Sequence, residues 1–329
     1  MRWPVIAVLC LLLFLHPSVP PVQAQDTSAC AACGEKLSGD FVEIEGQYYH
    51  SNCFTCDYCN KPIPDSFTRY EGKNYHTSCF EDHIALRCDV CGGIIKGKYI
   101  SNFWGNAYHP EHEGVEVQCS FCRRFIVGKL VEKSIVFQDG RHLCGICTST
   151  AVFESAEAKL LLMEVAERLA DFGLKVDPRS IEVNLVGNDA LRRLAAGASQ
   201  DARGFVDYEV ARTMSGDVTH RATRMYLLYG MPRTEMIGTI AHELTHVWLF
   251  LQEEKDRDNV LAEGSCNFSA YLVLQETGTD QAKFIIDSMQ NNPDAAYGEG
   301  FRRIKRYVEH NGLGGWLRLM KAPRQKASF

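Results

Sequence analysis

The chain has 329 residues, a formal net charge of −6 at pH 7 and 14 cysteines. This length is enough for two or three domains. Lys and Arg are spread along the chain without a basic block, which excludes the usual charge pattern of a nucleic-acid-binding protein.

The first 24 residues resemble a secretory signal peptide. Arg2 precedes an apolar run from Val5 to Leu15, and a small-residue cleavage site ends at Ala24. Such a run is short for a bilayer span, although an uncleaved anchor remains an alternative. We expect a secreted or periplasmic protein that begins at Gln25 and has no stable membrane span after cleavage.

Twelve cysteines lie between Cys30 and Cys147 and alternate with histidines in pairs separated by two residues. Two successive sets are joined by only Phe54 and Thr55, which is the pattern of a LIM domain. A two-residue spacing lets a tight turn present two ligands to one tetrahedral zinc ion. The predicted ligands are Cys30, Cys33, His50 and Cys53 for the first ion, and Cys56, Cys59, His76 and Cys79 for the second.

The same spacing repeats with variations in the next stretch. Its predicted ligands are Cys88, Cys91, His109 and His112 for a third ion, and Cys119, Cys122, Cys144 and Cys147 for a fourth. A disulfide framework is the alternative in a secreted protein. Histidines at ligand spacing favour structural zinc instead. We therefore expect a LIM domain at 25–85 and a divergent LIM-like domain at 86–150, both suited to binding other proteins.

Cysteine pairs end after Cys147, and patterns of regular secondary structure begin. We expect a long helix over Glu154–Leu174, a strand over Ile181–Val186 and a helix over Asp189–Ala196. Further strands are expected over Gly204–Val210 and Arg224–Tyr229. Gly230 and Pro232 then interrupt the chain before the next helix.

That helix is predicted over Arg233–Gln252 and contains the motif H-E-x-x-H, with His242, Glu243 and His246. Residues four apart share a helix face, so both imidazoles can reach one metal ion. Glu243 would then take a proton from water at that ion. The alternative is a surface helix with two unrelated histidines. The apolar stripe of this helix makes that alternative less favoured, because it indicates a buried helix.

A catalytic zinc needs a third protein ligand and one open position. Glu263 follows His246 closely enough to return on a second helix, and it is the predicted third ligand. A helix N-terminal acid is the alternative role for Glu263. Asn267, one turn later, could orient a ligand histidine. Cys266 is a possible nucleophile, but a packing role suits a helical cysteine better.

Four stretches together resemble the DA-one-like family of LIM-containing latent peptidases, the plant organ-size regulators. They are Gly140–Cys144, Leu228–Arg233 with Gly238–Glu243, Glu263–Cys266 and Tyr297–Arg302. The resemblance implies a gluzincin-type peptidase with Tyr297 as a donor to the tetrahedral oxyanion. The plant proteins carry ubiquitin-interacting segments where this chain has the signal-like segment, so ubiquitin activation is not carried over. We expect a secreted, bacterial member.

The sequence thus predicts an α+β chain: tandem LIM-type zinc modules, then a mainly helical gluzincin-like metallopeptidase domain at 151–329 with a small sheet. The expected cofactor is zinc, with one catalytic ion and up to four structural ions. The substrate would be a protein or peptide. We expect it to lie extended against an edge strand, and Arg224–Tyr229 is the best candidate because it precedes the active helix. The alternatives are a non-catalytic LIM adaptor on a degenerate scaffold and an enzyme held inactive by its LIM half.

Overall fold

The structure is a computed structural model. It describes residues 6–8, 29–195, 202–212, 218–252 and 258–322. By its contacts the described chain divides into an N-terminal unit, Pro4–Val115, and a C-terminal unit that runs from Glu116. Our sequence boundary after residue 150 follows the last cysteine pair, whereas the contacts divide the chain earlier, between the third and fourth metal-ligand sets.

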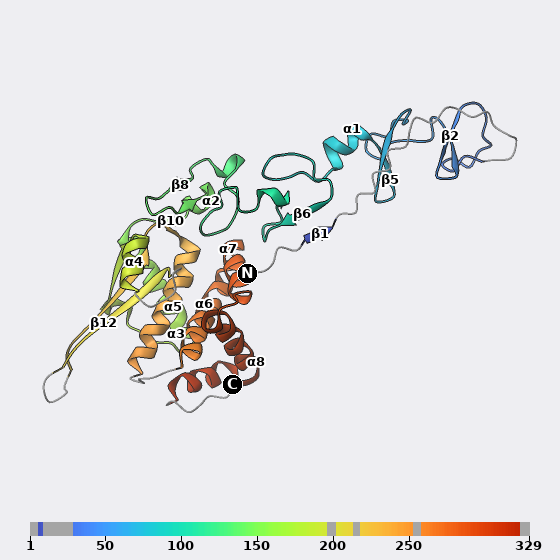
Figure 1. The fold of residues 1–329 in the computed structure, drawn as a ribbon. Coiled ribbons are helices and arrows are strands. Elements are labelled where there is room, and N and C mark those ends of the chain that lie inside the picture. The colour runs from blue at the N-terminus through green and yellow to red at the C-terminus, as the bar shows by residue number, and fades with distance from the viewer. Residues whose placement is uncertain (1–5, 9–28, 196–201, 213–217, 253–257, 323–329) are drawn as a thin grey trace. The chain divides into compact units, whose positions relative to one another are not determined.

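Short hairpins and single turns of helix make up the N-terminal unit. The hairpins are β2 (Phe41–Ile44) with β3 (Gln47–His50), β4 (Phe67–Tyr70) with β5 (Lys73–His76), and β6 (Lys98–Ser101) with β7 (Ala107–Tyr108). The helical turns are α1 (Thr77–Cys79), η1 (Phe80–Ile84) and η2 (Pro110–His112). Figure 1 shows these elements as small separate ribbons.

The first C-x2-C pair of each ligand set folds in the same way. The N–H of the first cysteine donates to the carbonyl five residues later, at 2.8 Å for Cys30, Cys88 and Cys119 and 2.9 Å for Cys56. The N–H four residues after that cysteine returns a bond to its carbonyl. That fourth position has a positive φ even where it is Arg123, at 61°. A repeated backbone turn therefore presents each sulfur pair.

Metal ligands form part of the small cores of this unit. Cys30 packs with Leu37 and Phe41. Cys56 packs in a second cluster with Phe54, Ile63, Tyr75 and Phe80. Because a core of three to five side chains contributes little stability, metal binding would be coupled to the folding of each module.

Strand β1 (Ile6–Val8) pairs antiparallel with β6, so part of the predicted signal segment lies in the three-stranded sheet β1-β6-β7. The rest of that segment, 1–5 and 9–24, is outside the described residues. In a chain cleaved after Ala24, this sheet would retain only β6 and β7.

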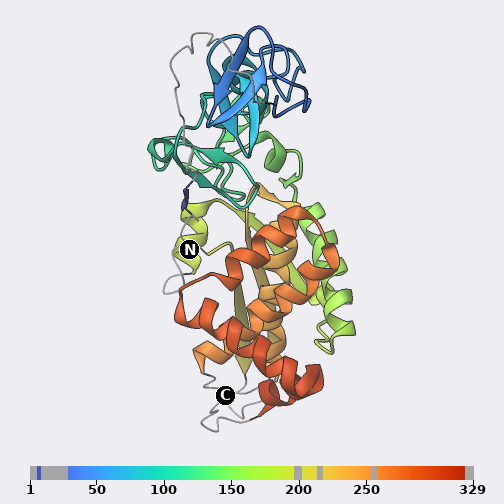
Figure 2. The ribbon, with the colours of Figure 1, turned by 90° about the vertical axis from the view of Figure 1, so that its right-hand side faces the viewer.

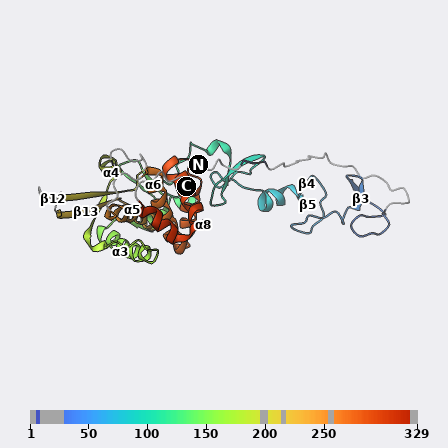
Figure 3. The ribbon, with the colours of Figure 1, turned by 90° about the horizontal axis from the view of Figure 1, so that it is seen from below.

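The C-terminal unit contains a sheet with the order β11-β13-β12. β11 (Ile181–Val186) runs parallel to β13 (Val218–Leu228), and β12 (Gly204–Arg212) runs antiparallel to it. Figure 3 shows β12 and β13 side by side. We expected a substrate-binding edge strand at Arg224–Tyr229, and this prediction is wrong, because β13 is paired on both sides. The strand order depends on a crossover through α4 (Asn188–Leu194), which periodicity does not reveal.

Helices cover this sheet in layers (Figure 2). α5 (Arg233–Leu251) packs on β12 and β13, α6 (Asn259–Thr277) packs on α5, and α8 (Gly300–Lys321) packs on α6. α3 (Ser155–Asp171) contacts β11 and α5, while α7 (Asp280–Gln290) and η5 (Ala295–Glu299) contact α6. None of the described helices is long and apolar enough to cross a membrane.

Two glycine-containing stretches mark the crossing of α6 and α8. A Cβ on Gly264 would lie 2.4 Å from the carbonyl carbon of Gly300, and a Cβ on Gly300 would lie 2.6 Å from the carbonyl oxygen of Val260. Only glycine fits where two backbones approach this closely. Beside this crossing, the indole of Trp316 donates to Ser265 Oγ at 3.1 Å. The position of Glu263 on α6 is therefore fixed by its neighbours.

The stretch with the fourth set of cysteines belongs to the same C-terminal unit. It comprises η3 (Gly128–Leu130), β8 (Ile135–Val136), β9 (His142–Leu143) and α2 (Gly145–Thr148). Arg141 donates to the carbonyl of Tyr229 at 2.9 Å, and Asp139 accepts from the N–H of Asn188 at 3.2 Å. β10 (Ala151–Val152) then pairs with β14 (Met231–Pro232), the strand that enters α5.

Candidate metal centres and active site

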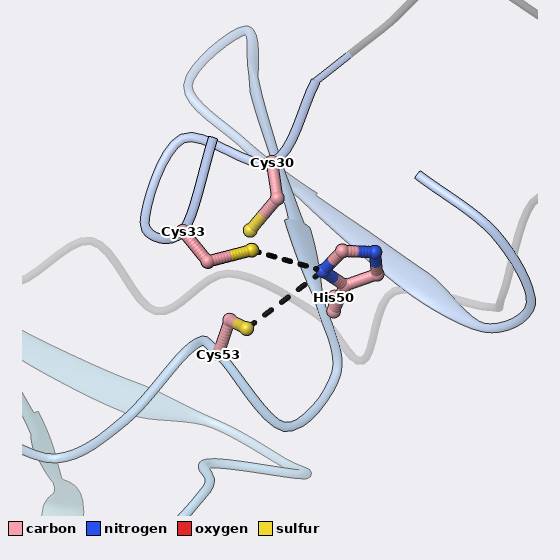
Figure 4. Close-up of side chains that lie close together, drawn as sticks. All are labelled: Cys30, Cys33, His50 and Cys53. Carbon is pink, nitrogen blue, oxygen red and sulfur yellow. Dashed lines mark hydrogen bonds between the residues drawn. The ribbon is translucent and has the colours of Figure 1, made fainter. Parts of the chain in front are cut away.

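Four groups of Cys and His side chains are each arranged as the ligands of one metal ion. They match the four predicted sets: Cys30, Cys33, His50 and Cys53; Cys56, Cys59, His76 and Cys79; Cys88, Cys91, His109 and His112; and Cys119, Cys122, Cys144 and Cys147. Figure 4 shows the first group, with its sulfur atoms and the Nδ1 of His50 turned toward one another.

Their spacing can be tested against zinc. With Zn–S near 2.3 Å and Zn–N near 2.0 Å, the edges of a tetrahedron are about 3.5 Å for S–N and about 3.8 Å for S–S. Cys33 Sγ lies 3.5 Å and Cys53 Sγ lies 3.7 Å from His50 Nδ1. Cys122 Sγ and Cys144 Sγ are 3.6 Å apart. These separations fit ligands of one ion better than ordinary thiol hydrogen bonds.

A backbone carbonyl orients one ligand histidine in each of the first three groups. The second ring nitrogen, Nε2, lies 3.3 Å from Lys36 O in His50, 3.0 Å from Pro62 O in His76 and 3.3 Å from Ile94 O in His109. A metal-ligating imidazole usually has such a partner, which fixes the tautomer. The disulfide alternative provides no reason for this repetition, and all the described cysteines are free.

The H-E-x-x-H motif lies in the middle of α5, which begins directly after Pro232 and buries most of its apolar stripe. His242 Nε2 and His246 Nε2 are 3.2 Å apart. Glu263 Oε2, from α6, lies 3.3 Å from the first and 3.5 Å from the second. Three donors joined by edges of about 3.3 Å form one face of a tetrahedron around a zinc-sized ion.

Glu263 Oε2 supports this interpretation independently. It is buried and has no hydrogen-bond partner among the described residues. A buried carboxylate oxygen without a partner is costly, and a metal ion would satisfy it. Burial opposes ionisation of Glu263, but the adjacent imidazoles of His242 and His246 outweigh it, so its pKa lies well below its usual range. The carboxylate is thus in the ionised form that a metal requires.

Asn267 connects two parts of the site. Its Oδ1 lies 2.9 Å from His242 Nδ1, the contact we expected from its place one turn after Glu263. Its amide Nδ2 donates to the carbonyl of Tyr297 at 2.8 Å. Asp294 holds the same segment by accepting from the N–H groups of Ala296 and Tyr297, both at 2.8 Å. One side chain therefore orients a histidine and places the tyrosine.

These side chains line a cavity of about 720 Å³ in the C-terminal unit. Its walls come from β12, α5, α6, α7 and the η5 segment. Tyr297 stacks on His242, with ring centroids 6.1 Å apart. Burial first, and then the charges of Glu263 and Glu243, raise the pKa of the Tyr297 phenol. Its hydroxyl stays protonated at neutral pH and can donate a hydrogen bond.

Glu243 is buried in the wall of the cavity. Burial raises its pKa above the usual value, against the opposing charges of His242 and His246. A raised carboxyl pKa suits a group that must both take and return a proton near neutral pH. A Cβ on Gly204 would lie 2.8 Å from Glu243 Cγ and from its Oε1, so β12 approaches the base as closely as glycine allows.

Sequence reasoning missed two residues of the cavity wall and one residue buried beside the histidines of the motif. Gly204 carried no signal beyond its place at a strand end. Tyr208 projects from β12 with a buried hydroxyl that has no partner among the described residues. Cys266, which the sequence suggested as a packing residue, is buried close to both histidines of the motif. The i, i+3 spacing from Glu263 was the available signal for Cys266.

Comparison with known families is consistent with this organisation. A family model for the LIM domain matches residues 30–83. A second model, described as Protein DA1, matches residues 209–283, which include all of α5 and α6. These matches, with the related proteins below, support the family resemblance inferred from the sequence.

The two plant proteins described first match most of this chain at low identity, and the human protein matches less than half of it. LIM domain-containing protein HDR3 of Oryza sativa is 24% identical over 90% of this chain and 73% of its own length. Protein DA1-related 2 of Arabidopsis thaliana is 26% identical over 80% of this chain, which spans only 56% of that relative. Actin-binding LIM protein 3 of Homo sapiens is 28% identical over 40% of this chain and 18% of its own length. The related plant proteins give no support to the bacterial, secreted origin that we expected.

Proposed function

We propose that this chain is a zinc-dependent peptidase that hydrolyses peptide bonds in protein substrates. The observation that supports the proposal is the triangle of donor atoms His242 Nε2, His246 Nε2 and Glu263 Oε2. The two nitrogens are 3.2 Å apart, and the oxygen lies 3.3 Å from His242 Nε2 and 3.5 Å from His246 Nε2. A zinc ion held there would polarise the scissile carbonyl and make water more acidic. The remaining roles fall to side chains of the cavity.

Glu243 is the general base. Its position one residue after His242 places the carboxylate in the cavity wall, on the helix that presents both histidines. It takes the proton of the attacking water and returns it to the leaving amine. Gly204 leaves room for it on the side of β12.

Tyr297 donates a hydrogen bond to the oxyanion that develops on the substrate carbonyl. Its raised pKa keeps the proton on the phenol, and Asn267 and Asp294 hold its backbone in place. A donor that is already oriented stabilises developing charge without reorganisation, which is typically worth about 3 kcal/mol for one such group.

The substrate binds in extended form along β12. This strand is at the end of the described sheet, opposite β11, and its residues Gly204, Phe205, Val206 and Tyr208 line the cavity. An extended peptide can add to such a strand through backbone hydrogen bonds, with alternate side chains entering the cavity. The proposal moves substrate binding from Arg224–Tyr229 to the neighbouring strand.

The N-terminal modules bind a protein partner, as LIM domains suggest. The predicted signal segment would make the chain a secreted or periplasmic enzyme. The LIM modules would form a separate half that binds the partner. The hypothesis that the LIM half keeps the enzyme inactive is tested by removing residues 25–115, because removing 25–150 would delete the fourth ligand set from the C-terminal unit.

The substitution Glu243→Gln tests the mechanism. It keeps the size of the side chain and leaves the three donors in place, so zinc content should not change while hydrolysis of an unfolded protein such as casein falls about 10³-fold or more. Glu276→Gln, on the exposed part of α6, is the matched control and should retain full activity. Undiminished cleavage by Glu243→Gln would refute the mechanism. Zinc binding without cleavage, both by the unmodified chain and by the chain that lacks residues 25–115, would favour the adaptor.

A further inference from the structure

Arg203 is the one Lys or Arg side chain among the described residues that line the cavity. Apart from the two histidines, the other ionisable groups with a charge at neutral pH in this lining are carboxylates, those of Glu235, Glu243, Glu263 and Asp294. Arg203 directly precedes β12, and its carbonyl accepts from the N–H of Leu228 at 3.0 Å, which ties its backbone to the end of β13. Its side chain is 38% exposed.

Two neighbours orient the guanidinium of Arg203. Its Nη1 donates to Oε2 of Glu235, the third residue of α5, whose side chain is only 3% exposed. Its Cζ lies 5.3 Å from the ring centroid of Phe121, a buried residue between Cys119 and Cys122 of the fourth ligand set. An ion pair and an aromatic face together fix the plane of a guanidinium. Arg203 is therefore oriented before any ligand arrives.

The pairing with Glu235 leaves donors of Arg203 for a ligand. A guanidinium has five N–H groups. Among the described residues, Glu235 is the hydrogen-bond partner of this one, through Nη1 alone. Two N–H groups in one plane match the two oxygens of a carboxylate. An arginine that only neutralised Glu235 would have no need to line the cavity.

The distance from Arg203 to the reacting groups is set by α5. Glu235 precedes Glu243 by eight residues on this helix, which corresponds to about 12 Å along its axis. An extended peptide covers that length in about three to four residues. A substrate group beside Arg203 is therefore about three residues away from the bond that is cleaved.

The direction of the substrate follows from β12. This strand runs along α5 in the same direction as the helix, because Gly204 approaches Glu243 and Tyr208 stacks on Phe250, with ring centroids 4.0 Å apart. Antiparallel pairing is the more stable way to add a strand. A substrate that adds antiparallel to β12 extends its C-terminal side toward Arg203.

We propose that Arg203 is a specificity-determining residue, which binds a carboxylate of the substrate about three residues after the cleaved bond. The inference rests on the proposed function, since it needs a peptide along β12. The carboxylate is that of an Asp or Glu side chain, or the free C-terminus of the substrate. Elsewhere in the cavity, Glu243 and Asp294 repel an acidic group, so the preference is confined to the end of the cavity near Arg203.

Peptides built around a bond that the full chain cleaves in casein test this proposal. One set has Glu, Gln or Lys at the second, third or fourth residue after the bond, and another set ends there as a free acid or an amide. At one of these positions kcat/KM should be about 10-fold higher for Glu than for Gln, or for the acid than for the amide. The ratio should fall to about 1 in Arg203→Gln and persist in Arg179→Gln, whose side chain is exposed outside the cavity lining.

The double variant Arg203→Gln with Glu235→Gln serves if the single variant fails to fold, because it leaves no unpaired buried carboxylate. Equal kcat/KM across both sets, or a preference for acid that survives these substitutions, would overturn the inference and leave the proposed function intact. A preference for Lys would also overturn it, and would assign recognition to Glu235 Oε1, which has no partner among the described residues. If the unmodified chain cleaves no bond in casein, the proposed function fails together with this inference.

Discussion

The two units of this chain relate metal and fold in opposite ways. In the N-terminal unit each ligand set has one buried cysteine, and its other three ligands are partly or fully exposed. The cores there hold a few side chains, and ligand cysteines are among them. In the C-terminal unit the donors His242, His246 and Glu263 project from helices that already bury a large core including Leu244, Phe301 and Trp316. In the first unit a bound ion would stabilise the fold, whereas in the second the fold alone brings the donor atoms together.

The fourth ligand set falls between these two cases. Its backbone turn repeats that of the first three sets, yet all four cysteines are buried. It also contacts the turn before α5 through Arg141 and the first residue of α4 through Asp139. Resemblance in sequence groups it with the LIM modules, whereas its contacts group it with the candidate peptidase.

His246→Ala has the largest expected effect. It tests whether the C-terminal unit folds without a metal ion at the α5 site. Losing one of three donors should reduce the zinc count from five to four and lower peptidase activity about 10³-fold or more. The melting temperature should fall by only a few degrees, since the core is unchanged. Native mass spectrometry and calorimetry measure the two quantities.

His310→Ala is the control for this variant, because His310 is exposed on α8. It should keep all five ions and full activity. Unfolding of the C-terminal unit in His246→Ala would contradict the comparison, because the ion would then be making the fold there as well.

Next in size is the contrast between Cys122→Ser and Cys91→Ser, one ligand from the fourth set and one from the third. Cys122 is fully buried, so its loss should destabilise the C-terminal unit by about 3 kcal/mol or more and reduce activity. Cys91 is exposed, and its loss should release the third ion while activity stays unchanged. Equal effects on activity would place the fourth set with the LIM modules after all.

Gly264→Ala probes the rigidity of the helix pair. Its Cβ would overlap the backbone of Gly300, so α6 and α8 must separate at a cost of about 1–3 kcal/mol. Glu263, the preceding residue, should shift, and zinc affinity at the α5 site should fall. Gly314→Ala is the matched control, since its Cβ would have only an ordinary contact, 3.5 Å from Arg318 Nη1. If Gly264→Ala and Gly314→Ala melt alike in calorimetry, the crossing is less tight than described.

The smallest expected effect concerns the ion pair that ties the fourth set to the sheet. Burial raises the pKa of Asp139, but hydrogen bonds from Arg141 and from the N–H of Asn188 lower it further, and the net shift is downward. A depressed acid pKa contributes stability above the unfolded pKa near 4, and this is lost as pH falls through the folded pKa. Asp139→Asn should therefore cost about 1–2 kcal/mol at pH 7 and almost nothing at pH 2.

Melting temperatures of Asp139→Asn and the unmodified chain, compared across this pH range, check the prediction. Asp171→Asn is the control, because Asp171 is exposed at the C-terminal end of α3. A difference between Asp139→Asn and the unmodified chain that persists unchanged at pH 2 would mean that charge on Asp139 is not the source of its effect.

Local signals made part of this structure predictable. The apolar stripe after Pro232 predicted α5 to within one residue at its C-terminal end, and alternation predicted β11 over its full length. Cysteine and histidine spacing predicted all four ligand sets. In each case the residues that determine the feature lie within about 50 positions of one another.

Features that depend on distant contacts were beyond such signals. Period-two alternation predicts a strand but not its neighbours, so β13 was taken for an edge strand. The two-residue pairing of β10 with β14 is too short to have a pattern. The role of Gly264 depends on Gly300, and the closeness of Cys266 to His242 depends on how α5 and α6 cross.

The pairing of β10 with β14 has a consequence for the order of events on the ribosome. All four cysteines of the fourth set precede β10, whereas His242 is synthesised about 90 residues later. Domains fold from the N-terminus as the chain emerges. The fourth ligand set would therefore bind its ion and fold first, and β10 would stay unpaired until β14 is synthesised. In cells short of zinc during translation, the fourth ligand set would not fold. β14, which leads into the H-E-x-x-H helix, would then lack its partner strand β10.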